Sequence, residues 1–245
     1  MLLTGLQICR LSLRMAGYFR LCEVASRPSS SERESAMKKL FALCLLGVLA
    51  VGQTFAADKD ADGFVSITDG KSFDGWKINE NKDSWSLEDG AFKAKGDRSH
   101  LFYVGDEKPF VNFELKVDCK TSEGSNGGIY FHTQYQETGW PKYGFETQVN
   151  NTHKDPIKTG SLYAVKNVSV SAAQDDKWWT QHIIVKGKTV TVKIDGKPVM
   201  EYSEPEGQVA GKDFTRVFDK GTFALQAHDP KSVVYFKNIK VKRLE

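Results

Sequence analysis

From Gly63 onward, apolar and polar residues alternate with a period of two almost everywhere along the chain. Such alternation is the pattern of β-strands with one buried face, and no stretch shows the sustained 3.6-residue period of an amphipathic helix. Hairpin signals such as Lys186-Gly187-Lys188 and Asp195-Gly196 separate the alternating runs. About a dozen short strands in roughly 185 residues predict an all-β fold, a two-sheet antiparallel jelly-roll sandwich. A closed barrel is the alternative architecture.

The expected strands are short and closely spaced. They cover residues 64–68, 84–87, 91–95, 100–104, 112–120, 128–134, 143–150, 161–165, 179–186, 189–194, 198–202, 222–228 and 233–244. With 245 residues, 40% of them hydrophobic, the chain is long enough to bury a substantial core. We therefore expect one domain over residues 57–245.

The first 56 residues differ from the rest of the chain. Met37–Lys39 precedes the apolar run Leu40–Gly52, and small residues follow it. This order is typical of a secretory signal peptide, and the run is shorter than the about 20 residues that cross a bilayer. We expect a signal peptide over residues 37–56, an exported periplasmic or extracellular protein, and no stable membrane insertion after cleavage. Residues 1–36 are then a spurious or disordered extension, with Met37 the true start.

Charge and cysteine content exclude two classes of protein for the mature chain. Residues 1–56 hold seven of the 34 Lys and Arg and three of the 31 Asp and Glu, so residues 57–245 carry a net charge of −1. Nucleic-acid binding, which needs a basic face, has no support in this composition. Only Cys119 remains after residue 56, so the mature chain forms no intrachain disulfide. Because Cys119 continues an apolar parity, we interpret it as a core residue.

Four expected strands carry apolar residues on one parity and hydrogen-bonding residues on the other. Side chains at alternate strand positions point to the same face. The polar positions are Tyr130 and His132; Glu146, Gln148 and Asn150; Ser161 and Tyr163; Gln226 and His228. Lys, which is common on solvated strand faces, is almost absent from these segments. Side chains with donors and acceptors, mixed with Tyr, predict a polar concave face that holds a polyhydroxylated ligand. A merely solvated face is the alternative.

Five segments occur in an order that resembles one known family. They are TDGKSFDGWK (68–77), NGGIYFH (126–132), YGFETQVNN (143–151), KTGSLY (158–163) and GTFALQAHDPKSVVYFKNIKVKRL (221–244). Together they resemble the 3-keto-disaccharide hydrolase-like domain, a family of exported bacterial proteins with a concanavalin-A-like jelly-roll fold. The resemblance implies action on glycosides whose sugar ring has been oxidised to a 3-ketone.

The chemistry of such a substrate suggests roles for the polar residues. A ketone at C3 acidifies the hydrogen at C2, so a base can remove it and the C1 oxygen can leave, after which water adds back. This route needs one base and a group that stabilises the enolate. The catalytic candidates are one carboxylate and two histidines: Glu146, His132 and His228. The candidates for substrate binding are Asn126, Tyr130, Gln148, Asn150, Ser161, Tyr163 and Gln226.

A metal site stays open at this point. Glu146 with His132 or His228 offers ligands for a divalent cation that would polarise the ketone. Because these residues come from different strands, their spacing assigns no metal. His100 and His182 lie among apolar residues, and we interpret them as structural. Trp140, in a loop, either stacks on a sugar ring or is buried.

Two other classes of function also stay open. A lectin-like carbohydrate-binding module without turnover needs the same polar face, since this fold serves both purposes. An envelope or surface scaffold protein is the third hypothesis. An enzyme requires a partly enclosed Glu146 with a shifted pKa, whereas a lectin can keep this carboxylate solvated.

Overall fold

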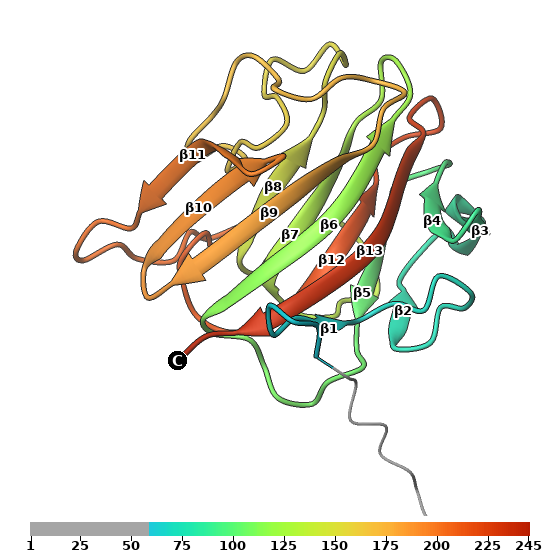
Figure 1. Ribbon diagram of the computed structural model, residues 1–245. Coiled ribbons are helices and arrows are strands. Elements are labelled where there is room, and N and C mark those ends of the chain that lie inside the picture. Colours follow the sequence, from blue (N-terminus) through green and yellow to red (C-terminus); the bar gives the residue numbers. More distant parts are fainter. Residues whose placement is uncertain (1–58) are drawn as a thin grey trace, which may run out of the picture. The chain divides into compact units, whose positions relative to one another are not determined.

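The computed structural model describes residues 59–245, so the signal peptide and the extension expected over residues 1–56 lie outside the described residues. Two antiparallel β-sheets, packed face to face, make up the described chain (Figure 1). The predicted sandwich is therefore confirmed, and the closed barrel is wrong because the strands divide between two separate sheets. No helix among residues 59–245 is long and apolar enough to cross a membrane.

The larger sheet has the strand order β11-β10-β9-β6-β13-β4-β3, with β1 paired to β13. Its strands are β1 (Val65–Ser66), β3 (Trp85–Glu88), β4 (Ala91–Ala94), β6 (Phe113–Thr121), β9 (Trp179–Lys186), β10 (Thr189–Ile194), β11 (Lys197–Ser203) and β13 (Val234–Arg243). The smaller sheet has the order β2-β5-β12-β7-β8. Its strands are β2 (Trp76–Ile78), β5 (Ser99–Tyr103), β7 (Gly127–Thr133), β8 (Phe145–Val149) and β12 (Thr222–Ala227). A 3₁₀ turn, η1 (Lys82–Ser84), precedes β3.

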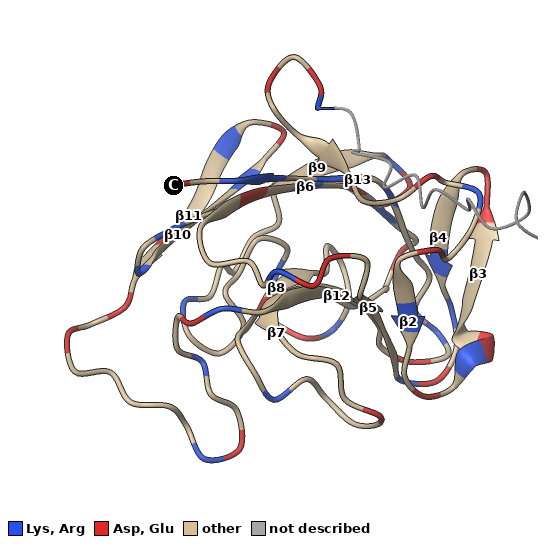
Figure 2. Ribbon diagram, turned by 90° about the horizontal axis from the view of Figure 1, so that it is seen from below, with Lys and Arg blue, Asp and Glu red and all other residues tan. Residues whose placement is uncertain are grey.

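The hydrophobic core lies between the two sheets. Figure 2 shows the sheets edge-on as two layers, with acidic and basic residues interspersed around them. Phe113 of the larger sheet packs edge-on against Phe131 and Phe223 of the smaller sheet, with ring centroids 5.9 and 5.0 Å apart. Cys119 is fully buried in the same core, as predicted. Because each strand buries one parity here, the opposite parity of the smaller sheet faces outward, where the long loops lie.

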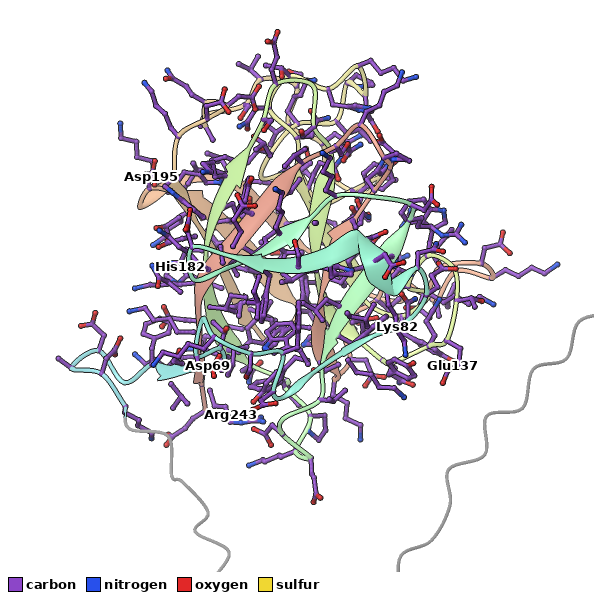
Figure 3. The ribbon with its side chains drawn as sticks, turned by 90° about the vertical axis from the view of Figure 1, so that its right-hand side faces the viewer. Asp69, Lys82, Glu137, His182, Asp195 and Arg243 are labelled. Carbon is purple, nitrogen blue, oxygen red and sulfur yellow. The ribbon has the colours of Figure 1, made fainter. Side chains whose placement is uncertain are left out.

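The outer face of the larger sheet carries charged side chains. His182 lies on this face, with its Nε2 2.9 Å from Oε2 of Glu114. In Figure 3, His182 and Asp195 lie on one side of the sandwich and Glu137 on the other. Glu137 belongs to the β7–β8 loop, which covers the outer face of the smaller sheet.

One expected strand is absent from the structure, and one observed strand has no counterpart among those expected from the sequence. Residues 161–165 form no strand. This segment runs beside β8, with Tyr163 N donating to Glu146 O at 2.9 Å, but a turn at Leu162–Val165 ends the pairing. Ala164 takes a positive φ of 56° in that turn. Conversely, β2 is missing from the prediction, because three residues are too few to display an alternating pattern.

Candidate active site

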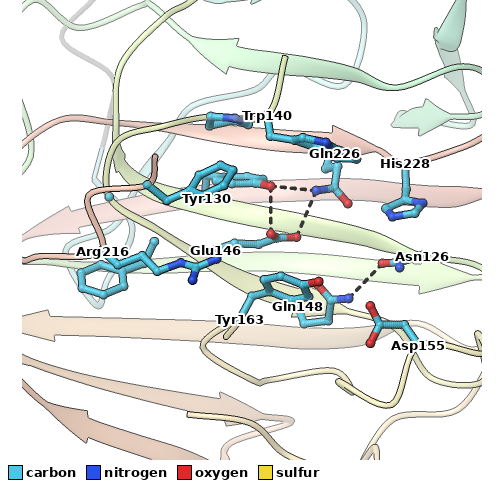
Figure 4. Close-up of a pocket in the computed structure, with 14 residues that line it drawn as sticks. Asn126, Tyr130, Trp140, Glu146, Gln148, Asp155, Tyr163, Arg216, Gln226 and His228 are labelled. Carbon is cyan, nitrogen blue, oxygen red and sulfur yellow. Dashed lines mark hydrogen bonds between the residues drawn. The ribbon is translucent and has the colours of Figure 1, made fainter. Parts of the chain in front are cut away.

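A pocket opens on the outer face of the smaller sheet, with a volume of about 320 Å³. Strands β7, β8 and β12 form its floor, and the long loops that follow β7, β8 and β11 form its walls (Figure 4). Its lining residues are Asn126, Tyr130, Trp140, Pro141, Gly144, Phe145, Glu146, Gln148, Asp155, Tyr163, Phe214, Arg216, Gln226 and His228. Seven of the ten residues proposed from the sequence are among them.

Glu146 lies at the centre of a hydrogen-bonded trio. Tyr130 and Glu146 are directly opposite each other on β7 and β8. The Tyr130 hydroxyl donates to Glu146 Oε2 at 2.9 Å, and Gln226 Nε2 donates to Glu146 Oε1 at 3.0 Å (Figure 4). Gln226 Nε2 also lies 2.8 Å from the Tyr130 oxygen. Three adjacent strands therefore hold one carboxyl group in a fixed orientation.

Gly128 leaves the space that the Glu146 side chain occupies. A Cβ built at Gly128 would overlap the Glu146 carboxyl group. The Gly127-Gly128 pair of the NGGIYFH segment thus does more than turn the chain. Its second glycine lets the carboxyl group lie flat over β7.

The surroundings of Glu146 change its acidity. Part of its surface opens into the pocket, but protein surrounds the side chain on all other sides. Burial raises the pKa of Glu146 to about 7, although the hydrogen bonds from Tyr130 and Gln226 act in the opposite direction. Both charge states of Glu146 are thus populated near neutral pH, which suits a general base. Burial also raises the pKa of Tyr130 well above its usual value, so its hydroxyl keeps its proton.

Two of the buried side-chain oxygens among residues 59–245 belong to the pocket lining and have no hydrogen-bond partner. Gln148 Nε2 donates to Asn126 Oδ1 at 3.0 Å, and Gln226 Nε2 is engaged by the trio. The Oε1 atoms of Gln148 and Gln226 are buried and unpartnered within residues 59–245. Buried polar atoms are nearly always hydrogen-bonded, so these acceptors are suited to receive hydrogens from a bound ligand.

His228 forms the edge of the pocket nearest Trp140. Its Nδ1 lies 2.8 Å from Oδ2 of Asp229. Burial would raise the pKa of Asp229, but hydrogen bonds from His228 and Ser232 lower this pKa to about 2. Asp229 is therefore a carboxylate at neutral pH and orients the imidazole, as in other carboxylate–histidine pairs.

Loops supply pocket residues that sequence reasoning missed. Arg216 has a positive φ of 45°, and its guanidinium carbon lies 5.3 Å from the centroid of the Phe214 ring. Within the described residues, Arg216 forms no ion pair. Asp155 also lines the pocket, and its Oδ1 accepts the Ile157 N–H at 2.9 Å. Because loops lack a periodic pattern, no sequence signal marks these residues.

His132 does not reach the pocket, contrary to the sequence prediction. Thr133 pairs with Thr222 and Phe131 with Phe223, so His132 is the extra residue of a β-bulge, with φ at 53°. A bulge turns its residue away from the regular alternation. The ring is buried beside Phe113 of the larger sheet, and its Nε2 donates to Val111 O at 2.8 Å.

Asn150 and Ser161 also lie outside the pocket, where they shape its walls. Asn150 Nδ2 donates to Asp155 O at 3.0 Å and Ile157 O at 2.8 Å, which folds the loop after β8. Ser161 Oγ donates to Lys158 O and accepts the Val168 N–H, both at 2.7 Å. Their polar atoms are used by the backbone rather than offered to a ligand.

The metal ligands considered from the sequence do not all come together. His132 lies in the core, away from Glu146 and His228. Within residues 59–245, no group of three or more His, Cys, Asp or Glu side chains is arranged to hold a metal ion. His132 therefore does not join Glu146 in a cation site, and a cation held by Glu146 with His228, which both line the pocket, stays a prediction.

Comparison with known proteins agrees with this geometry. Residues 63–242 match the model of the 3-keto-α-glucoside-1,2-lyase-like domain. The chain belongs to this family. It is also 30% identical, over 174 residues, to a 3-keto-disaccharide hydrolase of Bacteroides thetaiotaomicron. That match covers 58% of this chain and 59% of the relative, so this chain spans little more than half of the relative's length.

Solved structures place this member of the 3-keto-α-glucoside-1,2-lyase-like family among known sandwiches. A candidate glycosyl hydrolase of Parabacteroides distasonis superposes with a TM-score of 0.62 at 24% identity, over 76% of this chain and 95% of its own. A carbohydrate-binding module of Bacillus subtilis superposes with a TM-score of 0.51 at 15% identity, over 69% and 95% of the two chains. At these identities the likeness shows the fold alone.

Proposed function

We propose that this protein cleaves the glycosidic bond of glycosides whose sugar ring carries a ketone at C3, by elimination across C1 and C2 followed by hydration. The observation that carries the proposal is Glu146, a carboxyl group enclosed in a pocket with its pKa raised to about 7. Membership of the 3-keto-α-glucoside-1,2-lyase-like family supports the same substrate class.

In the elimination, the Glu146 carboxylate removes the C2 hydrogen as a proton. The electrons move to the ketone oxygen, and the resulting enolate is stabilised by a donor in the pocket, for which the Arg216 guanidinium, in no ion pair within residues 59–245, is suited. As the C3 ketone re-forms, the C1–O bond breaks and leaves a C1=C2 double bond. The departing oxygen takes a proton from His228, which Asp229 holds in place.

Hydration restores the groups to their starting states. Water adds to C1 of the unsaturated ketone, and His228 takes the proton that the water loses. Glu146 returns its proton to C2. The net change is addition of one water molecule across the glycosidic bond, with no charged sugar intermediate at C1.

Ordinary glycoside hydrolysis is the competing chemistry, because Asp155 is a second carboxylate in the pocket lining. That mechanism needs two carboxyl groups flanking the bond that breaks. Figure 4 shows Asp155 beside Asn126 and Gln148, and one of its oxygens is engaged by Ile157 N. These contacts support a mechanism with Glu146 as the single base over one with two carboxyl groups flanking the bond.

A lectin-like binding module is the alternative function. The unpartnered oxygens of Gln148 and Gln226 favour it as much as they favour an enzyme, since sugar hydroxyls would satisfy them in either case. Glu146 separates the two functions, because binding alone does not require a carboxyl group with a raised pKa.

The test compares oxidised and unoxidised substrates. We expect the protein to release a 3-keto-monosaccharide from 3-keto-disaccharides and to leave the parent disaccharides intact, as measured by chromatography of the products. Cleavage of the parents at a similar rate would contradict the elimination route. Binding of either sugar without release of product would establish the lectin-like function instead.

A further inference from the structure

His100 lies beside the pocket but is absent from its lining. On β5, Leu101 faces the core between the sheets, so His100 points to the opposite face of the smaller sheet. It pairs in register with Gln226 on the neighbouring strand β12. Directly opposed residues on a sheet have Cβ atoms about 4.5 to 5.5 Å apart. The imidazole is therefore a direct neighbour of the Glu146 trio.

The His100 side chain is buried without any hydrogen bond. None of its surface is exposed, and neither Nδ1 nor Nε2 has a partner within residues 59–245. Burial lowers its pKa to about 3, and the nearby Arg98 guanidinium acts in the same direction. The ring is thus neutral and carries one donor and one acceptor, both unused. An unpartnered donor and acceptor destabilise a fold, so their presence beside a pocket requires an explanation.

The Trp140 side chain lies between His100 and the pocket. The indole packs edge-on against the His100 ring at 5.5 Å between centroids, and it lines the pocket on its other side. Its further contacts are with rings and charge, at 5.5 Å from the His228 ring and 5.2 Å from the Arg98 guanidinium. The loop that carries it is tied to Glu80, whose Oε1 accepts Gly139 N–H at 2.9 Å. This hydrogen bond fixes the loop backbone at Gly139, whereas the Trp140 side chain is held by its ring and charge contacts.

We propose that Trp140 covers an inner part of the binding site, and that His100 is a ligand-binding residue which contacts a hydroxyl or ketone oxygen of the sugar when the indole moves aside. The inference rests on the proposed function for the identity of the ligand. It accounts for the two unpartnered nitrogens of His100, which complete their hydrogen bonds only in the complex. Movement of the indole also enlarges the pocket, so that the pocket holds more of a disaccharide than it does with Trp140 in its present position.

Replacing His100 by Phe tests this inference through two opposed effects. His100→Phe keeps a planar ring and removes both unpartnered polar atoms, so we expect the melting temperature to rise by about 2 to 4 °C. The same change removes a contact with the ligand, so kcat/KM for a 3-keto-disaccharide should fall roughly tenfold to hundredfold. The matched control is His182→Phe on the outer face of the larger sheet, which should leave kcat/KM unchanged.

A second variant tests the cover itself. Diethyl pyrocarbonate modifies accessible neutral imidazoles, and mass spectrometry locates the modified residue. We expect His100 to be protected in the wild-type protein without ligand and to react in Trp140→Ala. His100 that stays unreactive in Trp140→Ala would overturn the covering role of Trp140, whether or not His100→Phe folds.

The outcomes separate this inference from the proposed function. Wild-type turnover of the 3-keto-disaccharide with full kcat/KM in His100→Phe would overturn the inference and leave the proposed function intact. No turnover by the wild type would overturn the proposed function. The inference is then decided by calorimetric titration with the unoxidised disaccharide: binding that His100→Phe weakens supports it, and binding that is absent or unaffected overturns it.

Discussion

Glu146 obtains its position and its acidity from two different sources. Strand alternation places it on the same face as Gln148, as the sequence pattern predicts, and the register of β7 with β8 sets it opposite Tyr130. Its raised pKa comes from burial under loops that carry no such pattern. The face was therefore predictable, whereas the enclosure that makes the carboxyl group a base was not.

Glu146→Gln is the residue-level test of the base. Gln has nearly the same size and can keep one hydrogen bond, so the fold should survive while the proton acceptor is lost. We expect kcat to fall by about 10² to 10⁴, the usual contribution of a general base, with no decrease in melting temperature at pH 8. Glu201→Gln, on an exposed strand, is the control. A fully active Glu146→Gln variant would remove Glu146 from the mechanism.

The raised pKa of Glu146 predicts the pH dependence of activity. Only the carboxylate accepts the C2 proton, so kcat/KM should rise with pH and level off above about pH 7. We expect this rise in stopped assays across pH 5 to 9. An unchanged kcat/KM over this interval would show that no group with such a pKa controls the reaction.

The same pKa predicts a change in stability with the opposite sign. Because the folded state holds the Glu146 proton more tightly than the unfolded state, the group stabilises the fold below its ordinary pKa of 4.5, and this contribution is lost as pH rises through about 7. Glu146→Gln lacks this effect. The melting temperature of the variant, measured by calorimetry, should therefore rise relative to that of the wild type as the pH increases from 4.5 to 7.

At the scale of the elements, local departures from regular strands decide which residues reach the pocket. The bulge on β7 turns His132 into the core, and a turn replaces the strand expected over residues 161–165. Neither departure leaves a pattern in the sequence, since position 132 lacks the Gly that marks one class of bulge. The alternation of strand side chains correctly placed Tyr130, Gln226 and His228 at the pocket, because these residues lie on or directly after regular strand segments.

Gly128→Ala tests how β7 and β8 fit together. The backbone of Gly128 has no positive φ, so alanine is tolerated there, but its Cβ would overlap the Glu146 carboxyl group. We expect a loss of kcat with a fold that remains intact by circular dichroism. In the Glu146→Gln background the same change should cause little further loss, because both changes act on one group. Additive losses would contradict this interpretation.

Asn150→Ala tests the loop that follows β8. The Asn150 side chain donates to two loop carbonyls, so its removal leaves buried acceptors unpaired and should lower the free energy of unfolding by about 1 to 3 kcal/mol. Because that loop carries Asp155 into the pocket, KM should rise as well. Denaturant unfolding and steady-state kinetics measure the two effects. The exposed Gln208→Ala should change neither.

For the whole molecule, the sequence predicted the sandwich because nearly every strand has one buried parity. The partition of strands between the sheets, and the loops that enclose the pocket, depend on contacts between distant segments, such as Phe113 with Phe223. Such contacts are not encoded in any local window of residues.

We also propose that the protein is exported, since residues 37–56 have the pattern of a signal peptide. The exported form should begin at Ala57 or Asp58. Intact-mass measurement of protein recovered from outside the cytoplasm tests this, and a mass that includes Leu40–Gly52 would contradict it.

The central claim is that the C2–H bond breaks during cleavage of the glycosidic bond. The most direct measurement compares 3-keto-disaccharides carrying hydrogen or deuterium at C2 of the oxidised ring. Elimination predicts that kcat/KM is clearly lower for the deuterated substrate, because Glu146 must remove that atom. Equal kcat/KM values, with all deuterium still at C2 of the released sugar, would contradict the elimination mechanism.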